Sequence, residues 1–175
     1  LRALRPDLNI ADLRGNVPTR LRKLGASNWD GIILACAGLE RLGFNVGIGG
    51  FPFEGHSYGC ELLSSHDFLS AGGQGIIAMQ VRSGDRATTQ FLEAVSDPQT
   101  LLCLRAEREF LRLLNGDCDS PVGVLAAIGD GSMRMSAQVF KPPALAPLAG
   151  GVEVSAANAN IEGLAVKLME QIDRG

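Results

Sequence analysis

The sequence is poor in several features that would point to a function directly. Its 175 residues include two histidines, one tryptophan and one tyrosine, and the formal net charge is only −3. So small a net charge gives no electrostatic basis for binding nucleic acid. No apolar run reaches the roughly 18 residues of a membrane-spanning helix. We therefore expect neither nucleic acid nor a membrane among its partners.

Metal-binding and disulfide patterns are also missing. His56 and His66 have no neighbour at metal-ligand spacing, and no pair of carboxylates stands out for acid–base catalysis. The four cysteines are far apart and form no Cys-x-x-Cys pair: Cys36, Cys60, Cys103 and Cys118. This spacing predicts reduced thiols in an intracellular protein without a metal site, with Cys36 and Cys103 in the core.

The start of the chain has no segment typical of a signal peptide. The first residue is Leu1 rather than Met, and residues 1–6 resemble the last turn of a helix. We therefore expect a fragment or a processed chain.

The most informative stretch is residues 13–24, Leu-Arg-Gly-Asn-Val-Pro-Thr-Arg-Leu-Arg-Lys-Leu. A strand is expected over residues 8–12 before it. Gly15 and Asn16 favour a turn, and Pro18 suits the first position of a helix over residues 18–24, with Asn16 or Val17 as its cap.

Arg14 would lie in this turn and Arg20 in the first helical turn. Free N–H groups and the helix dipole attract anions at a helix N-terminus, and guanidinium groups bind carboxylate or phosphate bidentately. The pattern therefore suggests an anion site. The alternative is two solvated arginines in a basic segment that also contains Arg22 and Lys23.

A second strand–helix unit follows. Residues 31–35 form a short apolar run typical of a buried strand, and a helix is expected over residues 37–42. Alternating strands and helices predict an α/β domain with a parallel sheet. Because ligands bind at the carboxyl ends of such strands, Ala35, Gly38 and Arg41 would share a rim with the two arginines. Arg41 could equally be a solvated helix residue.

The segment that follows this unit is less regular. Residues 44–70 show no clear period, although residues 61–69 could form a helix. Gly72-Gly73-Gln74-Gly75 precedes an expected strand over residues 76–81.

The last part of the sequence predicts an α-β-β-β-α unit whose helices cover one face of a small antiparallel sheet. Gly129-Asp130-Gly131 is a strong hairpin signal between the first two strands. The expected helices cover residues 88–95, 99–114 and 157–172, and the expected strands residues 122–128, 133–140 and 151–155.

Cys118 lies in a loop between a helix end and a strand start. Its neighbours Asp117 and Asp119 disfavour the thiolate. This context suits a thiol that is used once, for covalent attachment, rather than a catalytic nucleophile. An incidental loop cysteine is the alternative.

Several ordered stretches resemble the porphobilinogen deaminase family, also called hydroxymethylbilane synthases. They are residues 4–8, 13–21 and 32–43, then Gly73-Gln74-Gly75, Arg105-Ala106-Glu107-Arg108 and the loop 116–123 around Cys118. Together they span most of the chain.

The resemblance implies a transferase of haem and chlorophyll biosynthesis. Such an enzyme joins four porphobilinogen molecules head to tail on a covalent dipyrromethane cofactor and releases ammonia. Cys118 would hold the cofactor through a thioether. Arg14, Arg20 and Arg41 would bind carboxylates of the cofactor and the growing chain, and Ala35 and Gly38 would add backbone contacts. A cytoplasmic monomer is implied, or a plastid enzyme in a plastid-bearing source.

The resemblance also implies a domain plan. Residues 1–70 would be a truncated, periplasmic-binding-protein-like α/β domain, residues 71–92 a return strand and linker belonging to a missing first domain, and residues 93–175 a small α+β domain with a three-stranded antiparallel sheet. No residue here matches the family's catalytic aspartate, so none is assigned a catalytic role, and we expect this chain alone to be inactive.

The residues alone also allow two other interpretations. The chain could be a non-catalytic module that binds small carboxylates, as solute-binding proteins do. The C-terminal unit could instead be a regulatory or interaction domain.

Overall fold

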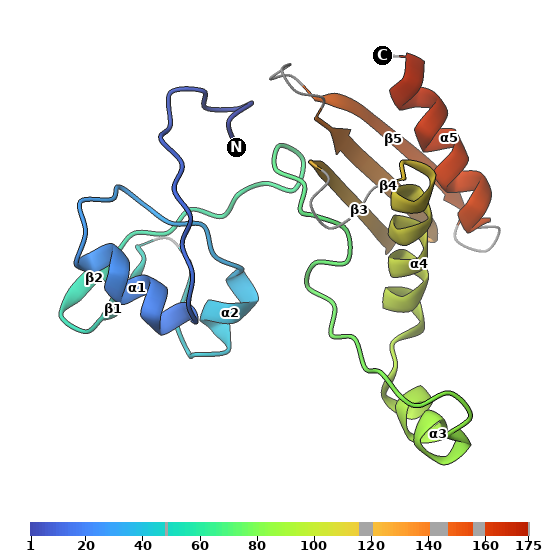
Figure 1. The fold of residues 1–175 in the computed structure, drawn as a ribbon, viewed down its shortest axis with the longest axis horizontal. Coiled ribbons are helices and arrows are strands. Elements are labelled where there is room, and N and C mark those ends of the chain that lie inside the picture. The colour runs from blue at the N-terminus through green and yellow to red at the C-terminus, as the bar shows by residue number, and fades with distance from the viewer. Residues whose placement is uncertain (48, 116–120, 141–146, 156–159, 175) are drawn as a thin grey trace. The chain divides into compact units, whose positions relative to one another are not determined.

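The computed structural model describes residues 1–47, 49–115, 121–140, 147–155 and 160–174. These residues form a mixed α/β protein that contains a three-stranded antiparallel sheet (Figure 1). The elements in chain order are α1 (Val17–Gly25), α2 (Cys36–Glu40), β1 (Phe51–Phe53), β2 (His56–Tyr58), α3 (Arg86–Val95), α4 (Pro98–Leu113), β3 (Val122–Gly129), β4 (Ser132–Val139), β5 (Leu148–Ser155) and α5 (Ile161–Arg174).

The chain divides into two compact units. The N-terminal unit is Arg5–Ser64, and the C-terminal unit is Leu1–Leu4 with Ser65–Gly175. Among the described residues, none of the helices has both the length and the apolar composition of a membrane span.

The N-terminal unit has a small core between its two helices and the β1–β2 hairpin. Its buried side chains are Leu21, Leu39, Val46 and Phe51. The Phe44 ring stacks on Phe51 with 4.5 Å between ring centroids. Aromatic packing therefore joins the hairpin to the segment that follows α2.

The β1–β2 hairpin lies within residues 44–70, the stretch without a clear hydrophobic period. Glu54 and Gly55 both have positive φ, at 46° and 82°, as a two-residue type I′ turn requires. The helix considered for residues 61–69 is wrong, because only a turn lies within that segment. Leu62 and Leu63 are exposed, so no buried face stabilises a helix there.

Three strand predictions are also wrong: residues 8–12, 31–35 and 76–81 have no strand structure. A strand exists only where a neighbour satisfies its backbone hydrogen bonds, and both sheets among the described residues are antiparallel and built from other segments. Ile33 and Ile77 are correspondingly exposed, at 49% and 78%. An apolar run predicts burial, but it does not supply a partner strand.

The C-terminal unit contains the sheet in the order β3-β4-β5. The Asp130-Gly131 turn has φ values of 51° and 70°, again type I′, and Val122 pairs with Val139 at the far end of the hairpin. This confirms the predicted hairpin. β5 begins three residues earlier than predicted, because Leu148 already pairs with Val139.

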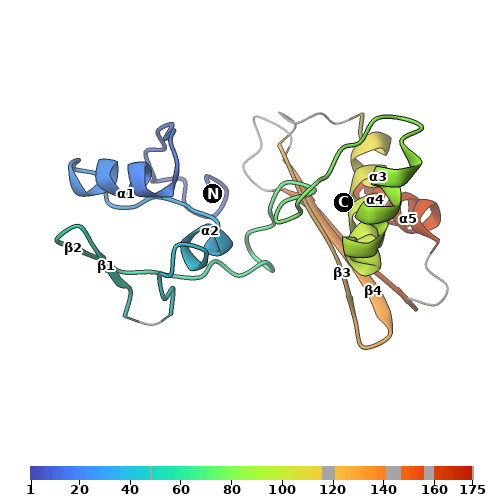
Figure 2. The ribbon, with the colours of Figure 1, turned by 90° about the horizontal axis from the view of Figure 1, so that it is seen from below.

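Helices α4 and α5 cover one face of this sheet (Figure 2). Phe110 of α4 and Leu168 of α5 are fully buried there with Met133 and Met135 of β4. The predicted α-β-β-β-α unit is therefore confirmed. Helix α3 buries no side chain, and Asp85 and Asp97 cap α3 and α4.

Candidate functional site

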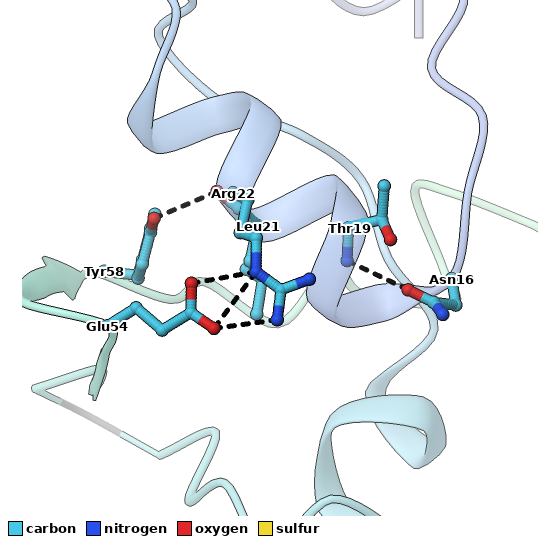
Figure 3. A network of polar contacts seen from close by, with 6 residues as sticks. All are labelled: Asn16, Thr19, Leu21, Arg22, Glu54 and Tyr58. Carbon is cyan, nitrogen blue, oxygen red and sulfur yellow. Dashed lines mark hydrogen bonds and ion pairs between the residues drawn. The ribbon is translucent and has the colours of Figure 1, made fainter.

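The N-terminus of α1 is built by the residues that the sequence indicated. Asn16 is the cap, and its Oδ1 accepts a hydrogen bond of 2.9 Å from Thr19 N–H (Figure 3). Gly15 has φ of +128°, a conformation that L side chains rarely adopt. The turn therefore requires glycine, and Pro18 begins the helix without losing a hydrogen bond.

Two cationic side chains are tied to this turn. Arg20 Nε donates a hydrogen bond of 2.7 Å to Gly15 O, which holds the guanidinium beside the N-terminus of α1. Lys23 Nζ donates to Arg14 O at 2.9 Å, and the Arg14 side chain is exposed. The Asn16 cap occupies Thr19 N–H and Pro18 has no N–H, so the positive charge of this site comes chiefly from the Arg20 guanidinium beside the N-terminus of α1. Such a site suits a carboxylate or a phosphate.

Helix α2 approaches the same end of α1. A Cβ on Gly38 would lie 3.3 Å from Cγ2 of Val17, the first residue of α1. Ala35 is the N-cap of α2, and its backbone is extended. The structure thus brings Gly38 and the first turn of α1 together. Arg41 lies at the other end of α2, as its exposed C-cap.

Arg22 is not a free cation. Its Nε and Nη2 donate to Oε2 and Oε1 of Glu54, each at 2.8 Å, so hairpin and helix are joined by a bidentate ion pair (Figure 3). The guanidinium lowers the pKa of Glu54, and the carboxylate raises that of Arg22. This partner, 32 positions away, could not be identified from sequence spacing.

The described cysteines do not have the features of nucleophiles. Cys36 and Cys103 are partly buried against the cores of their units, as predicted, and burial is the largest cause that raises the pKa of each thiol. Cys60 also packs against the N-terminal core. Cys118, the predicted attachment point, lies outside the described residues.

Glu107 is a buried structural residue that the sequence-based predictions did not include. Its side chain is buried on α4, and its two oxygens accept hydrogen bonds from Gly73 N–H at 2.7 Å and from Ala126 N–H at 2.9 Å. A sequence signal existed, because Glu107 lies three residues from Leu104 and from Phe110 on the apolar face of the helix. The structure thus joins the Gly73-Gln74-Gly75 and Ala106-Glu107-Arg108 motifs.

Two family models match the chain. Residues 1–90 match the model described as porphobilinogen deaminase, dipyromethane cofactor binding domain, and residues 101–172 match porphobilinogen deaminase, C-terminal domain. The candidate anion site falls in the first match, and Glu107 falls in the second.

Curated relatives agree with the family models. A porphobilinogen deaminase of Thiobacillus denitrificans is 39% identical over 173 residues, or 98% of this chain and 53% of the relative. That of Thermus thermophilus is 39% identical over 163 residues, or 93% and 50%. That of Roseiflexus castenholzii is 45% identical over 128 residues, or 73% and 39%.

This chain thus spans about half the length of the relatives that it matches most fully. Both family models agree in name with these relatives, and the first covers residues 1–90, just over half of the 175 residues. The chain therefore belongs to the porphobilinogen deaminase family.

Proposed function

We propose that this chain is the part of a hydroxymethylbilane synthase that binds the dipyrromethane cofactor and the growing pyrrole chain. The complete enzyme would be a transferase of tetrapyrrole biosynthesis that joins four porphobilinogen molecules head to tail and releases ammonia. Both family matches and the names of the relatives support this proposal.

The observation that carries the proposal is Arg20, fixed by Gly15 O at the N-terminus of α1. Each pyrrole of the product bears two carboxylates, so the enzyme needs preorganised cations. Arginine stays charged at every relevant pH and can bind a carboxylate with two parallel bonds. Each charge-assisted hydrogen bond of this kind contributes about 1.5–3 kcal/mol.

The residues at this site fit the cofactor. Arg14 and Arg20 would bind carboxylates of the cofactor and of the substrate. Ala35 and Gly38 would offer backbone groups beside them, and the missing side chain of Gly38 leaves room next to Val17. Arg41 would bind substrate carboxylates, and Cys118 would hold the cofactor as a thioether. When bound, the cofactor supplies the pyrrole terminus from which the chain grows.

The complete protein would contain further parts. We propose that residues 1–70 belong to a periplasmic-binding-protein-like domain. Residues 71–92 would return to a first domain carrying the catalytic aspartate, and residues 93–175 would be the third domain. The complete protein would be a cytoplasmic monomer. No observation on the described residues favours a solute-binding module instead.

Intact-mass measurement of the complete protein tests the cofactor assignment. The protein should carry two pyrrole units, and Cys118→Ser should remove them. An unmodified thiol after growth with porphobilinogen would contradict the assignment. The 175-residue chain should form no hydroxymethylbilane, and detectable product from it would refute the proposed dependence on a further domain.

A further inference from the structure

We propose that Glu54, on the β1–β2 hairpin, is a positioning residue for the anion site: acting through Arg22, it fixes α1 and thereby Arg20. The inference rests on the proposed function, because in that proposal Arg20 donates hydrogen bonds to the carboxylates of the ligand. It concerns a hairpin to which the sequence assigned no role.

Helix α1 has little apolar contact to hold it. Leu21 is its only buried side chain, and the helix has nine residues. At its N-terminal end, Val17 lies against Gly38 of α2. A short helix with one buried side chain depends for its orientation on the other groups that contact it. Around the C-terminal half of α1, several of these groups come from the hairpin.

The hairpin contacts the C-terminal half of α1 in three ways. Glu54 pairs bidentately with Arg22, whose guanidinium also lies 5.8 Å from the centre of the Phe53 ring. Tyr58 Oη donates a hydrogen bond of 3.0 Å to Leu21 O. The hairpin also approaches α1 so closely that a Cβ on Gly25 would lie 2.7 Å from Tyr58 Oη.

The position of Arg22 on α1 can determine the position of Arg20. Two residues apart, they project from opposite sides of the helix, about 200° around its axis. Fixing Arg22 on the hairpin side therefore sets the rotation of α1, and this rotation sets where Arg20 lies. The bond from Arg20 Nε to Gly15 O then holds the guanidinium at the turn.

The first test needs no ligand. In NMR spectra of the 175-residue chain, Glu54→Gln should shift the Nε–Hε resonance of Arg20 and speed exchange of the Arg20 amide, which donates to Asn16 O. We expect exchange to be roughly threefold to tenfold faster, since an exposed ion pair contributes modestly. The matched control is Glu153→Gln, which removes the similarly exposed Arg134–Glu153 pair of the C-terminal unit.

Two further variants distinguish a change in the position of Arg20 from a general loss of stability. Tyr58→Phe should produce a smaller change of the same kind, and exchanging the charges (Arg22→Glu with Glu54→Arg) should restore the wild-type Arg20 resonance. An Arg20 signal unchanged in folded Glu54→Gln would overturn the inference. So would an exchanged pair that restores the melting temperature but not the Arg20 signal, because Glu54 would then only stabilise the unit.

Titration with porphobilinogen separates this inference from the proposed function. Glu54→Gln should weaken binding roughly threefold to tenfold at a temperature where the chain is fully folded, and Arg20→Gln should weaken it more. If Arg20→Gln has no effect, the proposed function fails. If Arg20→Gln weakens binding and Glu54→Gln does not, the positioning role fails and the proposed function stands.

Discussion

Glu107 Oε2 accepts a hydrogen bond of 2.7 Å from Gly73 N–H, 34 positions away in the sequence. The other carboxylate oxygen accepts from Ala126 N–H of β3. One buried side chain therefore satisfies two backbone donors on two segments, a role that an apolar residue of the same size could not fill.

Replacement of Glu107 by Gln should destabilise the C-terminal unit. The amide keeps one acceptor, but its NH₂ group faces an N–H donor, so one buried donor loses its partner. The expected loss is about 1–3 kcal/mol in the free energy of unfolding, measured by urea denaturation. Glu93→Gln, at an exposed position of α3, is the control and should change little. Equal stability of the two variants would show that the buried carboxylate is dispensable.

Gly50→Ala should disrupt the β1–β2 hairpin. Gly50 has φ of +72°, and a Cβ there would clash with the backbone oxygen of Tyr58. We expect a loss of more than about 1 kcal/mol in the free energy of unfolding of the N-terminal unit. Gly59→Ala is the matched control, because a Cβ there meets no atom within 4 Å. Normal hairpin NMR contacts in Gly50→Ala would contradict this prediction.

The stability that the Asp97 cap gives to α4 should decrease at acid pH. Bonds from the backbone N–H of Thr100, and then from its side chain, lower the pKa of Asp97 from the ordinary 3.8. Because the folded pKa is the lower one, the cap stabilises α4 above pH 3.8 and is lost as the pH falls further. Asp97→Asn keeps a capping oxygen without a titration. At pH values below 3.8, the free energy of unfolding of the wild type should therefore decrease relative to that of this variant. A difference between the two, measured by chemical denaturation, that stays constant down to pH 2 would contradict this.

Arg41→Gln tests the substrate assignment at the end of α2. Arg41 is exposed at the C-cap, so its replacement should leave the melting temperature nearly unchanged. In the complete protein, it should slow addition of porphobilinogen roughly tenfold, the effect of losing one charge-assisted bond. Arg86→Gln on α3 is the control. Equal single-turnover rates for the two variants would show that Arg41 does not bind the substrate.

The C-terminal unit could be predicted because its signals are local. Asp130 and Gly131 define a hairpin by themselves, and Leu101, Leu104 and Phe110 recur at helical spacing over α4. The cap at Asn16 could also be predicted, because its side chain bonds to Thr19, only three residues ahead in the sequence.

The failures share a different cause. Strands over residues 8–12, 31–35 and 76–81 require partners elsewhere in the fold, which an apolar run does not identify. The hairpin was missed because β1 and β2 have only three residues each and Pro52 interrupts the first. The role of Glu107 was missed because a charge on an apolar helix face does not reveal which N–H groups it will meet.

The Glu107 bonds also determine how the molecule can be dissected. The two family matches divide between residues 90 and 101, yet Val124 N–H donates to Ser70 O, and Gly73 N–H donates to Glu107. A truncation between residues 90 and 101 would remove Ser70 and Gly73, the hydrogen-bond partners of Val124 and Glu107. It would also expose the edge of β3. An independently expressed C-terminal piece should therefore begin near Ser65, and shorter versions should aggregate through that edge.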